Sequence, residues 1–283
     1  MSRQTTRRVS SMLLFLCCAA PIRATENRAE SSTESGVSAG KVRITILFNE
    51  ALLIQSGSSS VLVDAFVEGP GSEGDSATVD KDRLTGLQRS MPIQLALVTH
   101  SHAEHFHPLI AGTFLKKHPE TVLASSPEII DAIRTKYPEY AAINAQLKKI
   151  RTDPGKITSR TLSGIQVGFI PFSHEASEFY PEMVLGHLIH LGGKKILVAG
   201  DAAMQPDNWQ PYGLQSQGID LALVPFWLFK EEATRTLLQK HVAPKKIVVV
   251  QIPSHQVQET IQQFSAQLPD VVLLSTSRAS FEF

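Results

Sequence analysis

The chain has 283 residues, 42% of them hydrophobic, and its 27 basic side chains balance 27 acidic ones. That length and composition suit one large domain, or two small ones, with a buried core. The first 25 residues hold four of the basic side chains and no acid, so the remainder carries 23 basic against 27 acidic side chains. A mildly acidic body argues against a nucleic-acid partner, because such proteins need basic surface to neutralise phosphates.

Residues 1–25 have the pattern of a secretory signal peptide. Arg7-Arg8 precede an apolar run at 12–21, and Ala24 lies near the expected cleavage point. The run is too short to be a permanent membrane anchor, and we expect no stable membrane span once the signal peptide is removed. We therefore expect export to the periplasm or the extracellular space. A buried N-terminal helix is the alternative interpretation.

Both cysteines, Cys17 and Cys18, fall inside this segment. A mature chain without cysteine has no disulfide and no thiolate ligand, so any metal must be held by histidine and carboxylate. The polar stretch 26–40 has no periodicity and is expected to be a flexible linker. Residues 41–283 are then the folded domain.

The elements expected in the domain alternate between strands and helices. Residues 42–48 predict a half-buried strand, 51–55 and 60–63 a hairpin, and 93–98 a buried strand. Ser126 and Pro127 mark a helix start, and Pro138 interrupts that helix. A surface loop is expected at 69–82. Further strands are expected at 158–161, 165–170, 184–191, 195–199, 219–224 and 245–250, with helices at 230–240 and 257–266. Two β-rich halves with helices predict an α/β fold, a four-layer αβ/βα sandwich.

The densest chemical feature is the segment 100–107, which holds four histidines and one glutamate directly after the 93–98 strand. Side chains two residues apart share a face of an extended chain, so His100 and His102 are expected to point the same way. Glu104 and His105 follow as the chain turns into a helix near Pro108. Imidazole and carboxylate together favour a divalent cation such as zinc. A polar loop with surface histidines is the alternative.

This block resembles the His-x-His-x-Asp-His signature of the metallo-β-lactamase superfamily, and the resemblance extends over most of residues 41–260. The hairpin that ends at Asp64 resembles the first motif of that superfamily. Later segments that end at His174, Asp201 and His255 resemble its third, fourth and last motifs. The chain is more similar to the ribonuclease Z and lactonase-like branches than to true β-lactamases, because it lacks their Gly-His-Thr-x-Gly segment.

The resemblance implies the metallo-β-lactamase fold and a site for one or two zinc ions, with manganese or iron as alternatives. It implies a first metal on His100, His102 and His174. It places a second metal on Glu104, His105 and His255, with Asp201 bridging the two. A metal-bound hydroxide would then attack the substrate. Glu104 would orient that nucleophile and pass on its proton, so Glu104 and Asp201 are the expected catalytic residues.

The chain departs from the family pattern at Glu104, where the superfamily has aspartate. The extra methylene moves the carboxylate outward, which is expected to weaken the second metal site or change its metal preference. The sequence therefore leaves open whether the site binds one metal ion or two.

Four other side chains are weaker candidates. Asp64 is expected to brace the metal loops through hydrogen bonds rather than bind an ion. His107 is expected to contact one of the metal-binding side chains without binding the metal itself, or to face solvent. Tyr180 and Trp227 are candidates for the substrate pocket, with core packing as the alternative for Trp227.

The sequence thus predicts an exported metal-dependent hydrolase that acts on a small ester, lactone, amide or phosphodiester. The alternatives are a non-catalytic metal-binding protein of the same fold and a true β-lactamase. A small-molecule substrate is the expected partner, with no nucleic acid. The substrate itself and the oligomeric state are not specified by the sequence.

Overall fold

The computed structural model describes residues 37–38, 40–48, 50–67, 92–175, 183–264, 268, 271–274 and 279–283. The chain divides into two units, Met1–Ser32 and Thr33–Phe283, and all described residues belong to the second. The predicted signal peptide, most of the linker, the 69–82 loop and Tyr180 lie outside the described residues. Within the described part of the chain, no helix is both long and apolar enough to cross a bilayer.

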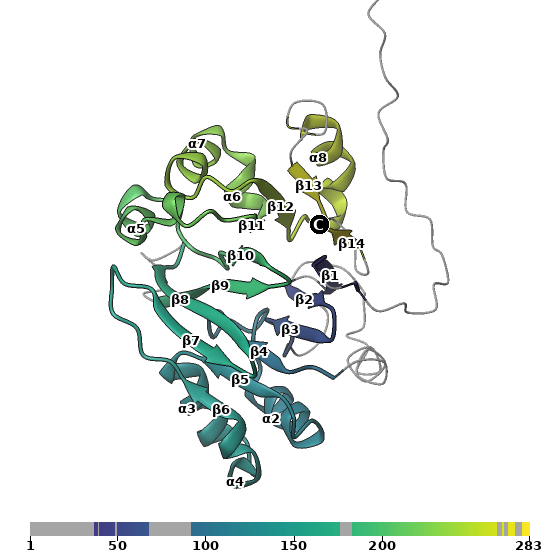
Figure 1. Cartoon of the computed structure of the whole chain (residues 1–283), viewed down its shortest axis with the longest axis vertical. Helices are drawn as coiled ribbons and strands as arrows, with labels where there is room; N and C mark the ends of the chain where they lie inside the picture. The colour runs from purple at the N-terminus through teal and green to yellow at the C-terminus, as the bar shows by residue number, and fades with distance from the viewer. Residues whose placement is uncertain are drawn as a thin grey trace, which may run out of the picture. The chain divides into compact units, whose positions relative to one another are not determined.

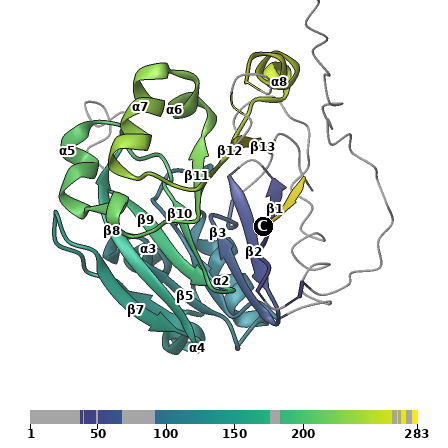
Figure 2. The same cartoon turned by 45° about the horizontal axis from the view of Figure 1, so that its top comes forward.

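Two seven-stranded sheets form the second unit (Figure 1). Figure 2, turned by 45°, shows the same strands with the helices outside them. The first sheet has the strand order β14-β1-β2-β3-β4-β5-β6 and the second the order β13-β12-β11-β10-β9-β8-β7. The strands of the first sheet are β1 (Arg43–Phe48), β2 (Ala51–Ser56), β3 (Ser59–Val63), β4 (Leu95–Leu97), β5 (Val122–Ser125), β6 (Leu147–Lys149) and β14 (Ser280–Glu282). Those of the second are β7 (Thr158–Leu162), β8 (Ile165–Ser173), β9 (Met183–Leu191), β10 (Lys194–Val198), β11 (Leu221–Pro225), β12 (Lys246–Val250) and β13 (Val271–Leu273).

Both sheets follow one plan, in which antiparallel strands are followed by parallel ones. In the first sheet β1, β2 and β3 are antiparallel neighbours, whereas β3, β4, β5 and β6 run parallel. In the second, β7 to β10 are antiparallel and β10 to β13 parallel. Parallel strands end at the same edge of a sheet, so the loops after β3 and β4 emerge together, as do those after β10 and β12. Strand β8 runs in the direction of β10, because both are antiparallel to β9, and it ends at the same edge.

Apolar side chains from both sheets, among them Ile44, Leu97, Phe169 and Val198, form a continuous core between them. Two further apolar clusters lie on the outer faces. The first sheet packs there against α2 (Pro108–Lys117), α3 (Pro127–Lys136) and α4 (Tyr140–Ile143). The second packs against α5 (Pro206–Trp209), α6 (Phe226–Lys230), α7 (Glu232–His241) and α8 (Val257–Phe264). Short 3₁₀ turns are η1 (Asn144–Gln146), η2 (Gln210–Tyr212), η3 (Leu214–Ser216) and η4 (Ser254–Gln256). The layers run helix, sheet, sheet, helix, which confirms the predicted four-layer α/β sandwich.

Local signals explain several element ends. The Ser126 hydroxyl accepts a hydrogen bond from the Ile129 amide at 3.4 Å and caps α3, which ends at Lys136, two residues before Pro138. Two expectations needed correction. The helix expected at 230–240 is α7 and begins only at Glu232, because Glu231 is extended (φ −83°, ψ 130°) and separates it from the shorter α6. The strand expected at 93–98 is only the three residues of β4.

Candidate metal centre

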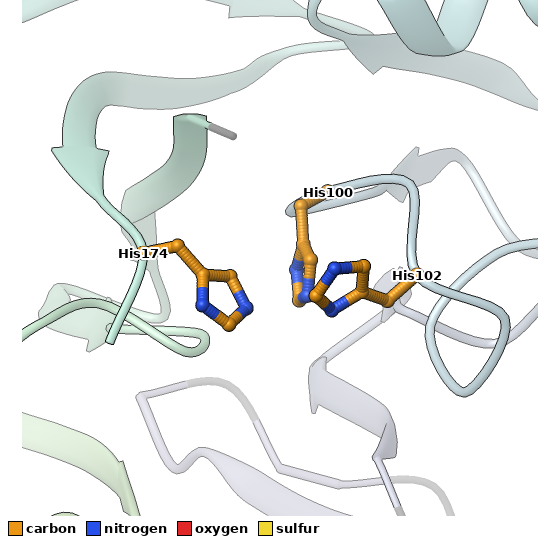
Figure 3. A group of neighbouring side chains, drawn as sticks. All are labelled: His100, His102 and His174. Atoms are coloured by element: carbon orange, nitrogen blue, oxygen red, sulfur yellow. The ribbon is translucent and has the colours of Figure 1, made fainter. Parts of the chain in front are cut away.

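The candidate site lies where the carboxyl ends of strands from the two sheets meet. His100, His102 and His105 belong to the loop after β4, His174 directly follows β8, and Asp201 comes three residues after β10. Figure 3 shows the His100 and His102 rings on one loop turned toward His174 on the facing segment. The fold thus brings residues about a hundred positions apart in the sequence into one group.

Two groups of potential metal ligands share His100. One ring nitrogen from each of His100, His102 and His174 lies within 4.8 Å of the others. The same holds for His100, His105 and a carboxylate oxygen of Asp201. The ring centroids are 4.7 Å apart for His100–His102 and for His102–His174. The predicted first-metal histidines are therefore gathered, and so are His105 and Asp201 from the predicted second site.

Asp201 belongs to the second group and also lies close to a histidine of the first. Its Oδ2 is 3.5 Å from His105 Nε2 and 3.9 Å from both His100 Nε2 and His174 Nε2. These separations exceed ordinary hydrogen-bond lengths. Two ligands on one tetrahedral ion, each with a bond of about 2.1 Å, are ~3.4 Å apart. The spacing around Asp201 Oδ2 is thus close to that of ligands sharing an ion.

The donor atoms are buried and have lone pairs to offer. Within the described residues, His100 Nε2, His105 Nε2 and Asp201 Oδ1 make no hydrogen bond. Burial, and then the neighbouring His105, lower the pKa of His100 to about 2, so its imidazole is neutral near pH 7. A buried polar atom without a partner costs roughly 1–3 kcal/mol, which a bound ion would offset. Neutral imidazole and carboxylate are the donor set that a divalent metal ion requires.

A hydrogen-bonded chain behind the site orients two of the histidines. The Thr99 amide and hydroxyl both donate to the Asp64 carboxylate at 2.7 Å. Because the Thr99 hydroxyl proton is used in that bond, its oxygen accepts from His100 Nδ1 at 2.9 Å. This assigns the proton of His100 to Nδ1 and leaves Nε2 facing Asp201 with a free lone pair.

Asp64 also accepts a hydrogen bond from His105 Nδ1 at 3.0 Å. Burial by itself would lower the pKa of His105, but the neighbouring carboxylates of Asp201 and Asp64 outweigh burial and raise it well above its usual value. Asp64 has a φ of 50°, an uncommon conformation for a residue other than glycine. It makes the contacts expected of a brace that turns His105 Nε2 toward Asp201.

Gly200 allows the Asp201 loop to pass close to Thr99. Its φ is +56°, and a Cβ at this position would lie 2.8 Å from Val184 Cγ1 and 3.1 Å from Thr99 Cβ. Only glycine meets both conditions without a shift of its neighbours.

Glu104 and His255 do not join His105 and Asp201 in either group of the described residues. Glu104 Oε1 is 3.9 Å from His102 Nδ1, beside the first group, and its side chain is 34% exposed. His255 is exposed within η4, with its Nε2 3.1 Å from Gln256 Nε2. The 3₁₀ turn holds it at the surface. Their predicted binding of a second metal therefore stays a prediction.

The remaining sequence candidates are less central. His107 is half-buried and forms the extended residue before α2. Trp227 is partly buried and packs against the outer apolar cluster of the second sheet, in line with the core-packing alternative.

Two buried groups near the site were missed. Glu50 lies in the turn between β1 and β2, and His187 lies on β9. An acid between two short strands is typical of an exposed turn, and the two histidines of β9, His187 and His190, lie on opposite faces of the strand and so do not indicate a shared site. Only the packing of the two sheets reveals them.

Comparison with known proteins agrees with this geometry. A family model described as "Beta-lactamase superfamily domain" matches residues 60–266. A UPF0173 metal-dependent hydrolase of Thermus thermophilus is 28% identical over 218 residues, which cover 74% of this chain and 83% of the relative.

Solved structures share the fold. The metallo-beta-lactamase fold protein YhfI from Bacillus subtilis matches with a TM-score of 0.55 and 14% identity, over 86% of this chain and 99% of that one. The isothiocyanate hydrolase from Delia radicum gut bacteria matches with a TM-score of 0.57 and 13% identity, over 85% and 99% of the two chains. At such identities the likeness concerns the fold alone.

Proposed function

Because the chain belongs to the metallo-β-lactamase superfamily, we propose that it is a metal-dependent hydrolase that cleaves a small ester, lactone, amide or phosphodiester. The observation that carries this proposal is the convergence of three histidine nitrogens on Asp201 Oδ2, at 3.5 to 3.9 Å. The related Thermus thermophilus protein, named a metal-dependent hydrolase, supports the same reaction class.

The residues divide into two binding positions in this proposal. His100, His102 and His174 would hold one divalent ion, and His105 with Asp201 a second. Zinc suits this nitrogen-rich set best, with manganese and iron as the alternatives. Divalent ions bound there would supply Lewis acidity and an activated water. Glu104, beside His102 and partly open to solvent, is in a position to accept a proton on the substrate side.

A non-catalytic metal-binding protein is the second candidate. It is favoured by one observation, the position of Glu104 and His255 outside both ligand groups of the described residues. Such a protein would bind metal and hydrolyse nothing. A true β-lactamase is the remaining alternative, and a panel of penicillins, cephalosporins and carbapenems distinguishes it from an esterase or phosphodiesterase.

The test is the metal content per monomer of the full chain, measured by elemental analysis beside hydrolysis of an ester, lactone, amide and phosphodiester panel. His102→Ala should lose metal and activity together. His118→Ala is the matched control, because His118 caps the far end of the ten-residue α2, about 15 Å along the helix from the metal loop. A content close to two metal ions per monomer, together with hydrolysis of a substrate, supports the proposal. Bound metal without hydrolysis of any substrate favours the non-catalytic metal-binding protein. A wild-type chain without metal refutes both.

We also propose export of this hydrolase to the periplasm or the extracellular space, on the strength of Arg7-Arg8 and the apolar run that follows. Cell fractionation with N-terminal sequencing tests this. The expected result is an exported chain that starts near residue 25. A full-length chain confined to the cytoplasmic fraction would overturn it.

A further inference from the structure

Asn208 on α5 contacts the two loops of the second sheet that carry candidate metal ligands. Ser173, the last residue of β8, directly precedes His174, and Ala203 lies two residues after Asp201. The carboxamide of Asn208 is hydrogen-bonded to the backbone of both Ser173 and Ala203. Because α5 is part of neither loop, this side chain links the His174 segment to the Asp201 segment from outside.

Three hydrogen bonds use the whole carboxamide of Asn208. Its Oδ1 accepts from the Ser173 amide at 2.7 Å, and its Nδ2 donates to the Ser173 carbonyl at 3.1 Å. Nδ2 also donates to the Ala203 carbonyl at 2.8 Å. The Ser173 amide can only donate, which fixes the orientation of the carboxamide. Two bonds to the amide and carbonyl of one residue are what a paired strand would supply. Asn208 therefore holds the end of β8 as a neighbouring strand would.

The two ligand-bearing segments also pair directly with each other. His174 and Ala202 form an isolated antiparallel bridge, and beside it the Glu175 amide donates to the Asp201 carbonyl at 2.8 Å. Strands β8 and β10 run in the same direction, on either side of β9. The chain has therefore reversed between the end of β10 and the bridge. Asp201 lies in that reversal, outside any helix or strand, so its position depends on contacts such as those of Asn208.

Trp209, the next residue, gives Asn208 a fixed base. Its side chain is completely buried, and its ring centroid lies 4.3 Å from that of Phe172 on β8. The Trp209 Nε1 donates to the Ala203 carbonyl at 2.7 Å, so this carbonyl accepts two hydrogen bonds from α5. The one-turn helix is thus packed against β8 and bonded to the Asp201 segment at the same time.

We propose that Asn208 is a positioning residue of the metal centre, which fixes the segments of His174 and Asp201 relative to each other. His174 Nε2 and Asp201 Oδ2 are 3.9 Å apart and belong to different ligand groups. Loss of the link should therefore disturb both metal positions. Asn208 acts through the backbone of the residues next to the ligands. The inference rests on the proposed function, because it requires metal ions at the site.

The experiment measures the zinc dissociation constants of the full chain after chelator treatment, by competition with a chromophoric chelator. Asn208→Leu keeps the approximate size of the side chain and removes all three hydrogen bonds. Each zinc constant should weaken roughly 10- to 100-fold, the usual effect of losing a partner that orients a ligand. The absorption spectrum of Co²⁺ bound in place of zinc should also change, because it depends on coordination geometry.

Gln146→Met is the matched control. The Nε2 of this glutamine donates at 2.8 to 3.1 Å to three backbone carbonyls, those of Leu115, His118 and Thr121. They lie at and beyond the end of α2 that is far from the metal loop. The control therefore also removes a carboxamide that joins backbone segments, and it should also lower stability. Its zinc constants and its Co²⁺ spectrum should stay as in wild type.

Urea unfolding of the metal-free proteins separates positioning from stability. Both variants should be less stable than wild type, with weakened zinc binding in Asn208→Leu alone. The role of Asn208 is overturned if zinc binding weakens as much in the control, or if Asn208→Leu binds zinc as wild type does. Should Asn208→Leu fail to fold, Asn208→Ser takes its place and is judged by the same two criteria, because its side chain is shorter by one atom and has a single donor.

The wild-type chain distinguishes this inference from the proposed function. A wild type that binds zinc, with the Asn208 variant binding it equally well, overturns the role of Asn208 and leaves the hydrolase standing. If wild type binds a single ion, its constant should weaken in the same way, because each ligand group contains a residue from a segment that Asn208 holds. A wild type that binds no zinc refutes the proposed function, and the role of Asn208 with it.

Discussion

His187 should make the stability of the domain depend on pH between 7 and 5. It is completely buried on β9, in edge-to-face contact with Phe169 at 5.6 Å, and among the described residues neither of its ring nitrogens has a hydrogen-bond partner. Burial, opposed by the charge of Asp64, lowers its pKa from 6.5 to about 4. The folded protein therefore keeps this ring neutral at a pH where the unfolded chain protonates it.

The direction of the effect follows from proton linkage. Between pH 6.5 and 4 the unfolded state binds more protons at His187, so the free energy of unfolding falls as the pH is lowered through this range. A shift of this size amounts to a loss of about 2 kcal/mol at pH 5, against a few tenths at pH 7. Well above pH 7 the loss is absent.

Urea unfolding of wild type and His187→Leu at pH 7 and pH 5, both with a chelator present, measures this loss. Leucine keeps most of the volume and removes two unpartnered nitrogens, so the variant should be at least as stable at pH 7. Its advantage should grow by about 2 kcal/mol at pH 5. Contributions from the metal-site histidines are common to both proteins and cancel. His190→Leu, on the half-buried face of the same strand, should show a much smaller change. Parallel pH profiles for wild type and His187→Leu would refute the reasoning.

Three further outcomes are expected. Gly200→Ala should lower the free energy of unfolding by about 1–3 kcal/mol and displace Asp201, because the added Cβ meets neighbours in a backbone conformation that favours glycine. Urea unfolding measures the loss of stability, and zinc titration measures the effect of displacing Asp201. Asp64→Asn should weaken zinc binding roughly 10- to 100-fold with the fold retained, since it removes the carboxylate that orients His105, and unchanged affinity would contradict the brace. Ser126→Ala should cost about 0.5–1 kcal/mol of stability by loss of a long helix cap and leave zinc binding unaltered, as urea unfolding and zinc titration would show.

The parts of the fold that follow local rules could be predicted from the sequence. The β2–β3 hairpin combines a strong apolar period with turn residues, and it was predicted within a residue or two. Strands β5 and β6 escaped prediction, because three or four residues are too few to show a period. Strand β14 escaped for another reason: it pairs with β1 from the opposite end of the domain, which no local pattern encodes.

The residues of the candidate site also differ in how far the sequence could predict their positions. His100, His102 and His105 are close in the sequence, so their grouping follows from a short segment. His174 and Asp201 could be placed beside them only through the resemblance of their motifs, and the structure brings them there. Glu50 gave no signal, because its burial depends on how two separate sheets stack. His255 shows the converse, since its motif resembles that of a ligand while the residue is exposed.

The pairing of β14 with β1 has a consequence for how the molecule is made. Ile44 lies opposite Phe281, and Arg43 Nε donates to Glu282 Oε1 at 3.0 Å across 239 positions of the chain. Until residue 282 has been synthesised, β1 presents an open backbone edge, which is prone to pair with other chains. Closing so long a loop also slows folding. The first sheet therefore stays incomplete during synthesis until β14 has left the ribosome and can pair with β1.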